Sequence, residues 1–187
     1  SFKENSMIYT SSPYSSSKAS SENIAQSYSE TFNINVCILR ITNNYGPYQH
    51  PEKFIPKSIL RSFDKKKIPL YGRGKNIREW IYVEDTCEAI LKVVNKFTNK
   101  TIYNIGSNER ISNLRSLKII LNNFANSYKN ILFVKDRPGH DFRYALDSTK
   151  FKNKFKWKNK TKFTKGIVKT IKWYNKNYDW LQTIRKK

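Results

Sequence analysis

The chain has 187 residues, of which 38% are hydrophobic and 14% aromatic, so it is long and apolar enough to fold around one core or slightly more. No apolar run approaches the ~20 residues that span a bilayer, and the first residues lack the charged start and apolar stretch of a signal peptide. Cys37 and Cys87 form no metal-binding or redox pair. We therefore expect a cytoplasmic protein that binds no metal.

The formal net charge of +22 raises the question of nucleic-acid binding. The lysines are spread along the whole chain among Asn and Ile, which favours a compositional bias over a dedicated patch. In the densest cluster, residues 151–165, Lys alternates with Phe and Trp157. We interpret this cluster as a solvated surface over buried aromatic rings. A positive field also attracts a nucleotide diphosphate-sugar, so charge alone does not separate these partners.

Strand-like and helix-like patterns alternate along the chain, which predicts α/β architecture. Ser12 and Pro13 mark the start of a helix, with Ser12 as its N-cap and Pro13 in its first turn. The apolar run 36–39 predicts a parallel strand covered on both faces. That strand ends in the loop 43–47, at the carboxyl end where open α/β sheets bind their ligands. The expected first helix carries one stripe at spacings of three and four, formed by Tyr14, Lys18, Ser21, Ala25, Tyr28 and Phe32.

Further elements follow in the same alternation, with Asp85 and Ser112 as expected caps of two of the helices. A Gly-rich turn at 71–74 contains the only closely spaced glycines, and no helix follows it. The sequence therefore contains no Gly-rich fingerprint for binding a dinucleotide phosphate. The expected helices lie at about 54–63, 85–97, 112–124 and 163–180, and the expected strands at about 77–83, 101–105 and 131–134.

Tyr14 and Lys18 form a YxxxK pair on the first expected helix. One helical turn places both side chains on the same face. The nearby ammonium favours the phenolate, so the phenol can accept a proton near neutrality. Taken alone, the pattern fits a catalytic pair and an ordinary helix face equally well.

Six segments in register resemble one enzyme family. The run Ser12–Ala19, SPYSSSKA, resembles the catalytic helix of extended short-chain dehydrogenase/reductases. The segments NNYGPY with PEKFIP, IPLYG, IREW with YVED, YNIG and DRPGHD narrow the resemblance to dTDP-glucose 4,6-dehydratases. The resemblance runs from about residue 11 to residue 180. It implies the C-terminal part of a Rossmann-type parallel sheet, formed by residues 1–50 and about 84–110. A smaller α/β nucleotide-sugar domain would comprise about 51–83 and 111–187.

The resemblance implies roles for the residues that match the family's motifs. Tyr14 would take the proton from the glucose C4 hydroxyl as hydride leaves for NAD, and Lys18 would hold the nicotinamide ribose. Asn44 would contact the cofactor. Asn43, Arg78 and Arg137 would meet the substrate diphosphate, a role that suits guanidinium groups because they donate paired hydrogen bonds. Without the resemblance, a less favoured interpretation is that the asparagines are turn formers and that Arg78 pairs with Glu79 or Glu84 on a surface.

The remaining substrate contacts are also implied by the resemblance only. They comprise two residues along the substrate path, three around the thymine base and two further nucleotide contacts. These residues are Lys53 and Phe54, then Pro69, Leu70 and Tyr71, then Asn113 and His140. His140 lies in a loop between Gly139 and Asp141, where a histidine is often merely solvent-exposed.

Several features of the family are missing from the sequence. The dehydration step uses an Asp and a Glu that follow a Thr upstream of the catalytic Tyr, and the 13 residues before Tyr14 contain no such triplet. The acidic ribose-binding residue is absent as well. Phe142 replaces a residue that is basic in many relatives. We therefore expect the chain to be a fragment that lacks the N-terminal NAD-binding part and has no activity alone.

The sequence thus predicts an NAD-dependent lyase fragment that acts on dTDP-glucose and yields the 4-keto-6-deoxy sugar plus water. Relatives dimerise through helices that include the one bearing Tyr14, so the resemblance allows a homodimer. One alternative is another NDP-sugar epimerase or decarboxylase of the same superfamily. The other is a non-catalytic basic domain that binds nucleotides or nucleic acid, and we favour it less because the lysines are dispersed.

Overall fold

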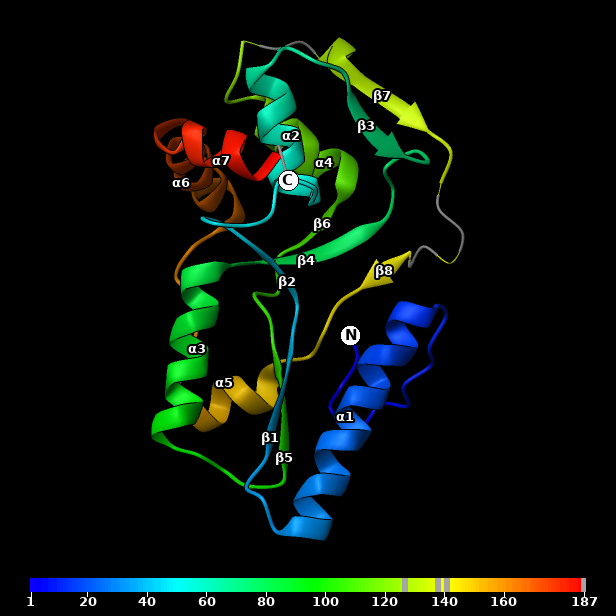
Figure 1. Ribbon diagram of the computed structural model, residues 1–187, viewed down its shortest axis with the longest axis vertical. Helices are drawn as coiled ribbons and strands as arrows, with labels where there is room; N and C mark the ends of the chain where they lie inside the picture. Colours follow the sequence, from blue (N-terminus) through cyan, green and yellow to red (C-terminus); the bar gives the residue numbers. More distant parts are fainter. Residues whose placement is uncertain (126–127, 137–138, 140–141, 186–187) are drawn as a thin grey trace.

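The computed structural model describes residues 1–125, 128–136, 139 and 142–185, and it is an α/β structure (Figure 1). The helices are α1 (Pro13–Phe32), α2 (Phe54–Phe63), α3 (Val83–Asn95), α4 (Asn113–Leu121), α5 (Thr149–Phe155), α6 (Phe163–Lys176) and α7 (Tyr178–Arg185), with a 3₁₀ turn at Tyr128–Asn130. The strands are β1 (Cys37–Ile41), β2 (Asn43–Tyr45), β3 (Ile68–Tyr71), β4 (Ile77–Tyr82), β5 (Thr101–Ile105), β6 (Arg110–Ser112), β7 (Ile131–Val134) and β8 (Arg143–Tyr144).

The lower part of the molecule is built on β1 and β5, which pair in parallel from Cys37 opposite Thr101 to Ile41 opposite Ile105. Helices α3 and α5 lie on one side of this pair and α1 lies on the other (Figure 1). The side of α3 and α5 encloses an apolar core. Its buried members are Ile81, Ala89, Val93, Tyr103, Ile105, Phe151, Phe155 and Trp157.

The upper part contains the other strands and helices α2, α4, α6 and α7 (Figure 1). Strand β2 pairs in parallel with β4, and β4 also pairs with β6 and β8. A separate parallel pair joins β3 to β7. The largest core lies between these elements, where Tyr45, Trp80 and Phe163 pack with Phe54.

Several predicted helix caps and buried rings are found in the structure. Ser12 caps α1 and forms a capping box with Ser15, and Pro13 occupies the first turn. Ser112 caps α4 by accepting a hydrogen bond from the backbone N–H of Arg115. The four aromatic rings of the lysine-rich cluster are buried, as predicted: Phe151, Phe155, Trp157 and Phe163.

Three predictions about element boundaries are wrong. The predicted loop at 43–47 contains strand β2, Asn43–Tyr45. Asp85 does not cap α3, because the helix already begins at Val83 and Asp85 lies in its first turn. Its buried carboxylate instead accepts hydrogen bonds from the backbone N–H groups of Lys160 and Thr161, just before α6. The final helix is interrupted at Asn177, which divides it into α6 and α7. Within the described residues, no helix is long and apolar enough to cross a membrane.

Candidate functional site

Tyr14 and Lys18 lie on the first two turns of α1, one turn apart, and both are exposed. The Tyr14 side chain is 76% exposed. The capping box fixes the start of the helix, and Ser17 donates its hydroxyl to the carbonyl oxygen of Tyr14 at 2.8 Å. The pair is therefore presented on a rigid support, with its phenol and ammonium open to a ligand. A phenol and an ammonium at this spacing can transfer a proton and hold a hydroxyl group.

Asn43 and Asn44 belong to β2, which continues from β1 and pairs with β4. Asn44 is held at both ends of its amide, because Thr86 donates to its Oδ1 at 2.6 Å and its Nδ2 donates to the carbonyl oxygen of Thr42. Asn43 differs, since its buried Oδ1 has no hydrogen-bond partner among the described residues. A buried polar atom without a partner is costly and marks a position where a ligand can bind. Sequence reasoning did not single out Thr86.

Arg78 lies on β4, opposite Ile111 of β6 and Tyr144 of β8. The next residue, Glu79, is fully buried. Its carboxylate accepts hydrogen bonds from the backbone N–H groups of Asn108 and Leu146 at 2.8 and 3.2 Å, and Arg110 lies 3.6 Å away. Glu79 thereby fixes the strand that bears Arg78. The sequence signal for this anchor was a carboxylate beside Arg78 in a strand whose other residues are apolar or aromatic.

The three residues expected around the base form most of β3, but they differ in exposure. Leu70 is only 1% exposed and packs into an apolar core, so a ligand can reach little of its side chain. Tyr71 is 39% exposed at the end of the strand, and Pro69 is half-buried. Asn113 begins α4, and its backbone N–H donates to the carbonyl oxygen of Asn76, just before β4. Asn113 is thus close in the structure to the strand that bears Arg78.

Lys53 and Phe54 mark the start of α2 and have different environments. Lys53 is 59% exposed and pairs with Glu52 at 2.9 Å, a contact that lowers the pKa of the Glu52 carboxyl. Phe54 lies against the core, with its ring stacked on Trp80 at a centroid distance of 6.1 Å. Phe54 is therefore mainly a packing residue, whereas Lys53 remains accessible.

A close backbone approach connects the start of α1 to the segment between β7 and β8. Gly139 has φ +64°, and a Cβ placed there would lie 3.2 Å from the carbonyl oxygen of Ser11. That segment connects β7, which pairs with β3, to β8, which pairs with β4. The start of α1 therefore approaches the segment between the two strands that pair with β3 and β4, which bear Tyr71 and Arg78. Arg137 and His140 belong to the same segment but lie outside the described residues.

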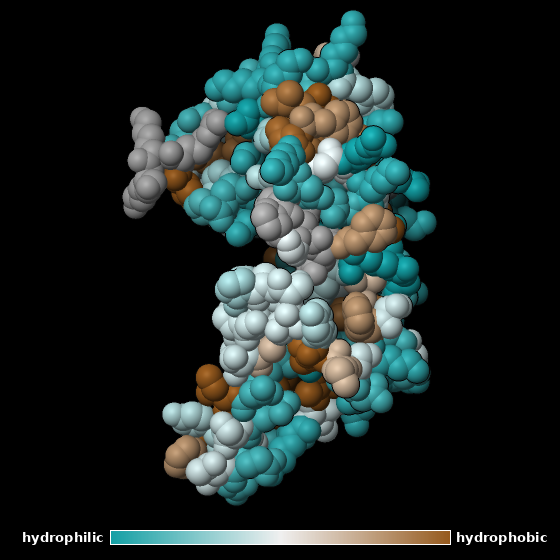
Figure 2. All heavy atoms as spheres, turned by 90° about the vertical axis from the view of Figure 1, so that its right-hand side faces the viewer, coloured by the Kyte–Doolittle hydropathy of each residue, from teal (hydrophilic) through white to brown (hydrophobic). Residues whose placement is uncertain are grey.

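Figure 2 shows this side of the molecule, with an indentation between its upper and lower parts. The described part of the chain contains no group of three or more His, Cys, Asp or Glu residues that could hold a metal ion. The arrangement suits an organic ligand that carries hydroxyl and phosphate groups. It combines an exposed phenol and ammonium on α1 with Arg78 on a buried, anchored strand.

The sequence profile of the GDP-mannose 4,6 dehydratase family matches residues 1–170, nearly the whole chain. The chain belongs to this family. A probable dTDP-glucose 4,6-dehydratase of Sinorhizobium fredii is 42% identical over the whole chain. A crystal structure of dTDP-glucose 4,6-dehydratase from Bacillus anthracis, solved with NAD, superposes with a TM-score of 0.93 at 42% identity and covers 98% of this chain. The Streptomyces venezuelae enzyme, also solved with NAD, gives 0.95 at 37% identity and the same coverage.

The chain spans about half the length of the relatives it matches. It covers 55% of the Sinorhizobium protein, 58% of the Bacillus chain and 57% of the Streptomyces chain. The α/β fold expected from the sequence is confirmed by these two structures. The individual site residues stay predictions, because no described contact involves a ligand.

Proposed function

We propose that this chain provides the substrate-binding and hydride-transfer residues of an NAD-dependent dTDP-glucose 4,6-dehydratase. The approach of Gly139 to Ser11 is the observation that supports this most directly. It joins the helix bearing Tyr14 to the segment that continues into the strands pairing with β3 and β4. Residues expected to act on the sugar and residues expected to bind the nucleotide then belong to one site.

Each residue has a defined part in this proposal. Tyr14 acts as the base toward the glucose C4 hydroxyl, and Lys18 holds a ribose hydroxyl. NAD supplies the hydride acceptor when it is bound. Arg78 neutralises the substrate diphosphate with paired hydrogen bonds. The acid and base of the elimination step have no counterpart in these 187 residues, so the complete reaction requires the part of the relatives that this chain leaves uncovered.

The residues present fit a dinucleotide at the start of α1. Tyr14 and Lys18 are exposed on one face, and the buried Oδ1 of Asn43 retains free hydrogen-bonding capacity. Asn44 already uses both ends of its amide within the protein. We therefore assign Asn44 mainly to joining β2 to α3 through Thr86, and we assign the direct contact with a ligand at this position to Asn43.

The proposal extends to location and organisation. We place the protein in the cytoplasm, with dTDP-glucose as its small-molecule partner and a homodimer as its assembly. We also propose the division in which residues 1–50 and about 84–110 contribute to the cofactor domain, and about 51–83 and 111–187 bind the nucleotide sugar. The strong positive charge of the chain favours a diphosphate ligand of this kind.

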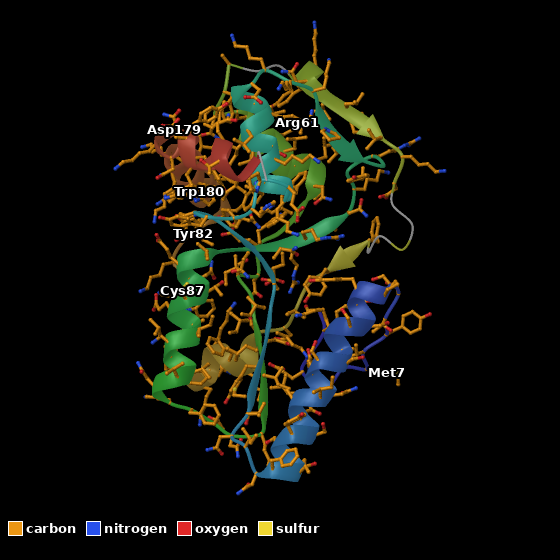
Figure 3. All side chains as sticks on the ribbon, viewed as in Figure 1. Met7, Arg61, Tyr82, Cys87, Asp179 and Trp180 are labelled. Carbon is orange, nitrogen blue, oxygen red and sulfur yellow. The ribbon has the colours of Figure 1, made fainter. Side chains whose placement is uncertain are left out.

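Calorimetry with dTDP tests the proposal. The chain should bind dTDP, and Arg78→Ala should weaken binding roughly tenfold or more, because a hydrogen-bonded charge pair is lost. Arg61→Ala is the matched control, since Arg61 lies on α2 and donates to the carbonyl oxygen of Lys67, away from β4 (Figure 3). Absence of dTDP binding, or equal effects of the two substitutions, would contradict the assignment. Tighter binding of UDP than of dTDP would favour the epimerase alternative.

An activity assay of the purified chain tests whether catalysis needs the part of the relatives that this chain does not span. We expect these 187 residues alone to form no detectable 4-keto-6-deoxy product from dTDP-glucose and NAD. Formation of that product would show that the elimination step does not need the missing Asp and Glu.

A further inference from the structure

One face of α6 carries a row of lysines. Lys162 immediately precedes the helix, and Lys165, Lys169, Lys172 and Lys176 follow at spacings of three and four residues. Such spacings place side chains on one side of a helix, and all of these lysines are exposed. Lysines that look dispersed along the sequence therefore gather into one basic surface, which we call the lysine row.

The lysine row has little counter-charge of its own. Among the described residues, Lys169 is its only member with an ion pair, and that contact with Glu84 is loose at 3.8 Å. Like charges one turn apart repel each other, which destabilises an isolated helix. The other side of α6 holds the helix in place, because Phe163, Ile167 and Tyr174 are buried in the core. The row is thus a positive surface on a firmly packed helix, and it suits a polyanion.

Three aromatic rings lie beside the lysine row. Trp173 is one helical turn from both Lys169 and Lys176 on the surface of α6. It contacts Tyr48 and Trp180, and the centroids of the three rings are 4.6 to 5.4 Å apart. The lysines and the rings therefore form one surface that offers both cationic and aromatic groups.

Tyr48 presents its ring to solvent at the edge of this group. It is 70% exposed, whereas Trp173 and Trp180, which it contacts, are half-buried. The backbone of Tyr48 has φ +61°, a left-handed conformation that bulky residues rarely adopt. Strained conformations of this kind concentrate at functional positions such as ligand-binding sites. The exposed ring is therefore a platform on which a planar group can stack.

This surface lies away from the candidate site for the nucleotide sugar. Lys169 lies over the ring of Tyr82, 5.3 Å from its centroid, and Figure 3 shows Tyr82 and Trp180 on the left of the molecule. The helix α1 and the strand β8, which border the candidate site, lie further to the right (Figure 1). A ligand bound at one surface therefore does not compete directly for the other.

Single-stranded nucleic acid has the groups that match this surface. Proteins that bind it combine a positively charged track for the phosphates with aromatic rings on which bases stack. Neighbouring lysines of the row are about 4.5–6 Å apart along the helix, so successive lysines can reach successive phosphates. A lipid surface fits less well, because a helix that binds in a membrane interface needs an exposed apolar face. The apolar face of α6 is buried in the core.

We propose that the lysine row of α6, together with Tyr48, Trp173 and Trp180, binds single-stranded nucleic acid. The ammonium groups neutralise successive phosphates, and an unpaired base stacks on the ring of Tyr48. The net charge of +22 strengthens the attraction over longer distances. This binding does not depend on the dehydratase function proposed above, and it needs neither a cofactor nor a nucleotide sugar.

Fluorescence anisotropy with a labelled single-stranded oligodeoxycytidylate of about 12 nucleotides tests the proposal. The chain should bind this probe. The logarithm of the affinity should fall against the logarithm of the salt concentration with a slope of about −3, as expected for four or five neutralised phosphates. The probe contains no thymine, and dTDP at an equal concentration should not displace it. A failure of dTDP binding would thus leave this test unaffected.

Matched substitutions separate the lysine row from the general positive charge of the chain. The double substitution Lys165→Gln and Lys172→Gln should weaken binding at least tenfold at about 0.1 M salt and make the slope shallower by about 1.4. The control is Lys96→Gln with Lys154→Gln, because these lysines are exposed on the lower part of the molecule and their loss removes the same charge. The control should change the affinity by less than about twofold, since distant exposed charges are screened.

The substitution Tyr48→Ala separates stacking from charge. It should weaken binding about fivefold or more, because the stacking of a base on an aromatic ring is lost. The salt slope should stay unchanged, since no charge is removed. Circular dichroism should show that all variants are folded, as expected for substitutions of exposed side chains.

Four results would overturn the proposal. The first is the absence of binding to the probe. The second is equal weakening by the two lysine pairs, which would make binding a consequence of net charge alone. The third is unchanged binding by the Tyr48→Ala variant, because the rings would then take no part. The fourth is displacement of the probe by phosphatidylserine–phosphatidylcholine vesicles at a lower phosphate concentration than by the unlabelled oligonucleotide, which would make a membrane the partner.

Discussion

The two faces of the β1–β5 pair are covered by contacts of opposite character. On the side of α3 and α5, Phe151, Tyr103 and Trp157 pack as a fully apolar cluster, with ring centroids 5.5 to 5.8 Å apart. On the side of α1, the described contacts are mainly ionic, led by Arg40 bonded to Glu22. Only one residue of α1, Ser29, is buried.

This difference shows that α1 is positioned by directional polar contacts and not by an apolar core. Polar contacts fix an orientation, and the apolar side chains of Tyr28 and Phe32 on the helix remain exposed. The two faces therefore contribute unequally to the packing of the chain, and substitutions on each face should have different consequences.

The largest expected effect comes from truncating the apolar face. Phe151→Ala removes a fully buried ring and should lower the free energy of unfolding by about 3–5 kcal/mol. The same change on the other face, Phe32→Ala, should cost less than about 0.5 kcal/mol in the isolated chain, because that ring is 62% exposed. Urea denaturation followed by tryptophan fluorescence measures both. Equal losses would show that α1 is packed as tightly as α5.

Removing the buried carboxylate of Glu79 should have an intermediate effect on the free energy of unfolding. Glu79→Ala removes the acceptor of the backbone N–H groups of Asn108 and Leu146, of which Leu146 is buried, and we expect a loss of about 2–3 kcal/mol. Glu84→Ala is the control, because that side chain is 66% exposed and its pairing with Lys169 is loose at 3.8 Å. The comparison would fail if both substitutions changed the urea midpoint equally.

The ion pair between Arg40 and Glu22 should contribute less to the free energy of unfolding than Phe151 or Glu79. Arg40 and Glu22 are 16% and 22% exposed and are joined by paired hydrogen bonds, so Arg40→Met should cost about 1 kcal/mol. The more exposed pair Lys100 and Glu30 should contribute almost nothing. A double-mutant cycle with Glu22→Gln isolates the coupling energy, which should fall as salt is raised. A coupling energy that salt leaves unchanged would mean that the pair is shielded by packing.

The sequence predicted most elements because their signals are local. The N-caps at Ser12 and Ser112 and the apolar run at 131–134 require only neighbouring residues, and each is found as predicted. The role of Asp85 was missed because its partners, Lys160 and Thr161, are 75 or more residues away along the chain. Contacts of that range depend on tertiary structure, which no local pattern encodes.

The candidate site shows the same limit. The YxxxK spacing predicted that Tyr14 and Lys18 share a face, which follows from helix geometry alone. No pattern predicted that Leu70 would be buried while Tyr71 remains accessible, since that depends on the pairing of β3 with β7 and on packing against α4. The approach of Gly139 to Ser11 likewise joins segments that are distant in sequence.

The smallest expected effect concerns the reactivity of the two cysteines, which compares a half-buried thiol with an exposed one without any substitution. Cys37 lies on β1 beneath the α3 and α5 side, where burial raises the pKa of its thiol despite the opposing influence of Lys150. Cys87 is exposed on α3 (Figure 3). Because only the thiolate is alkylated, iodoacetamide at pH 8 should modify Cys87 severalfold faster than Cys37.

The pH dependence of Cys37 labelling distinguishes a raised pKa from simple steric protection. With a raised pKa, the Cys37 rate should keep increasing at pH values above the range in which an ordinary thiol levels off, and mass spectrometry of the labelled peptides measures this. Steric protection alone would instead slow Cys37 by a constant factor at every pH.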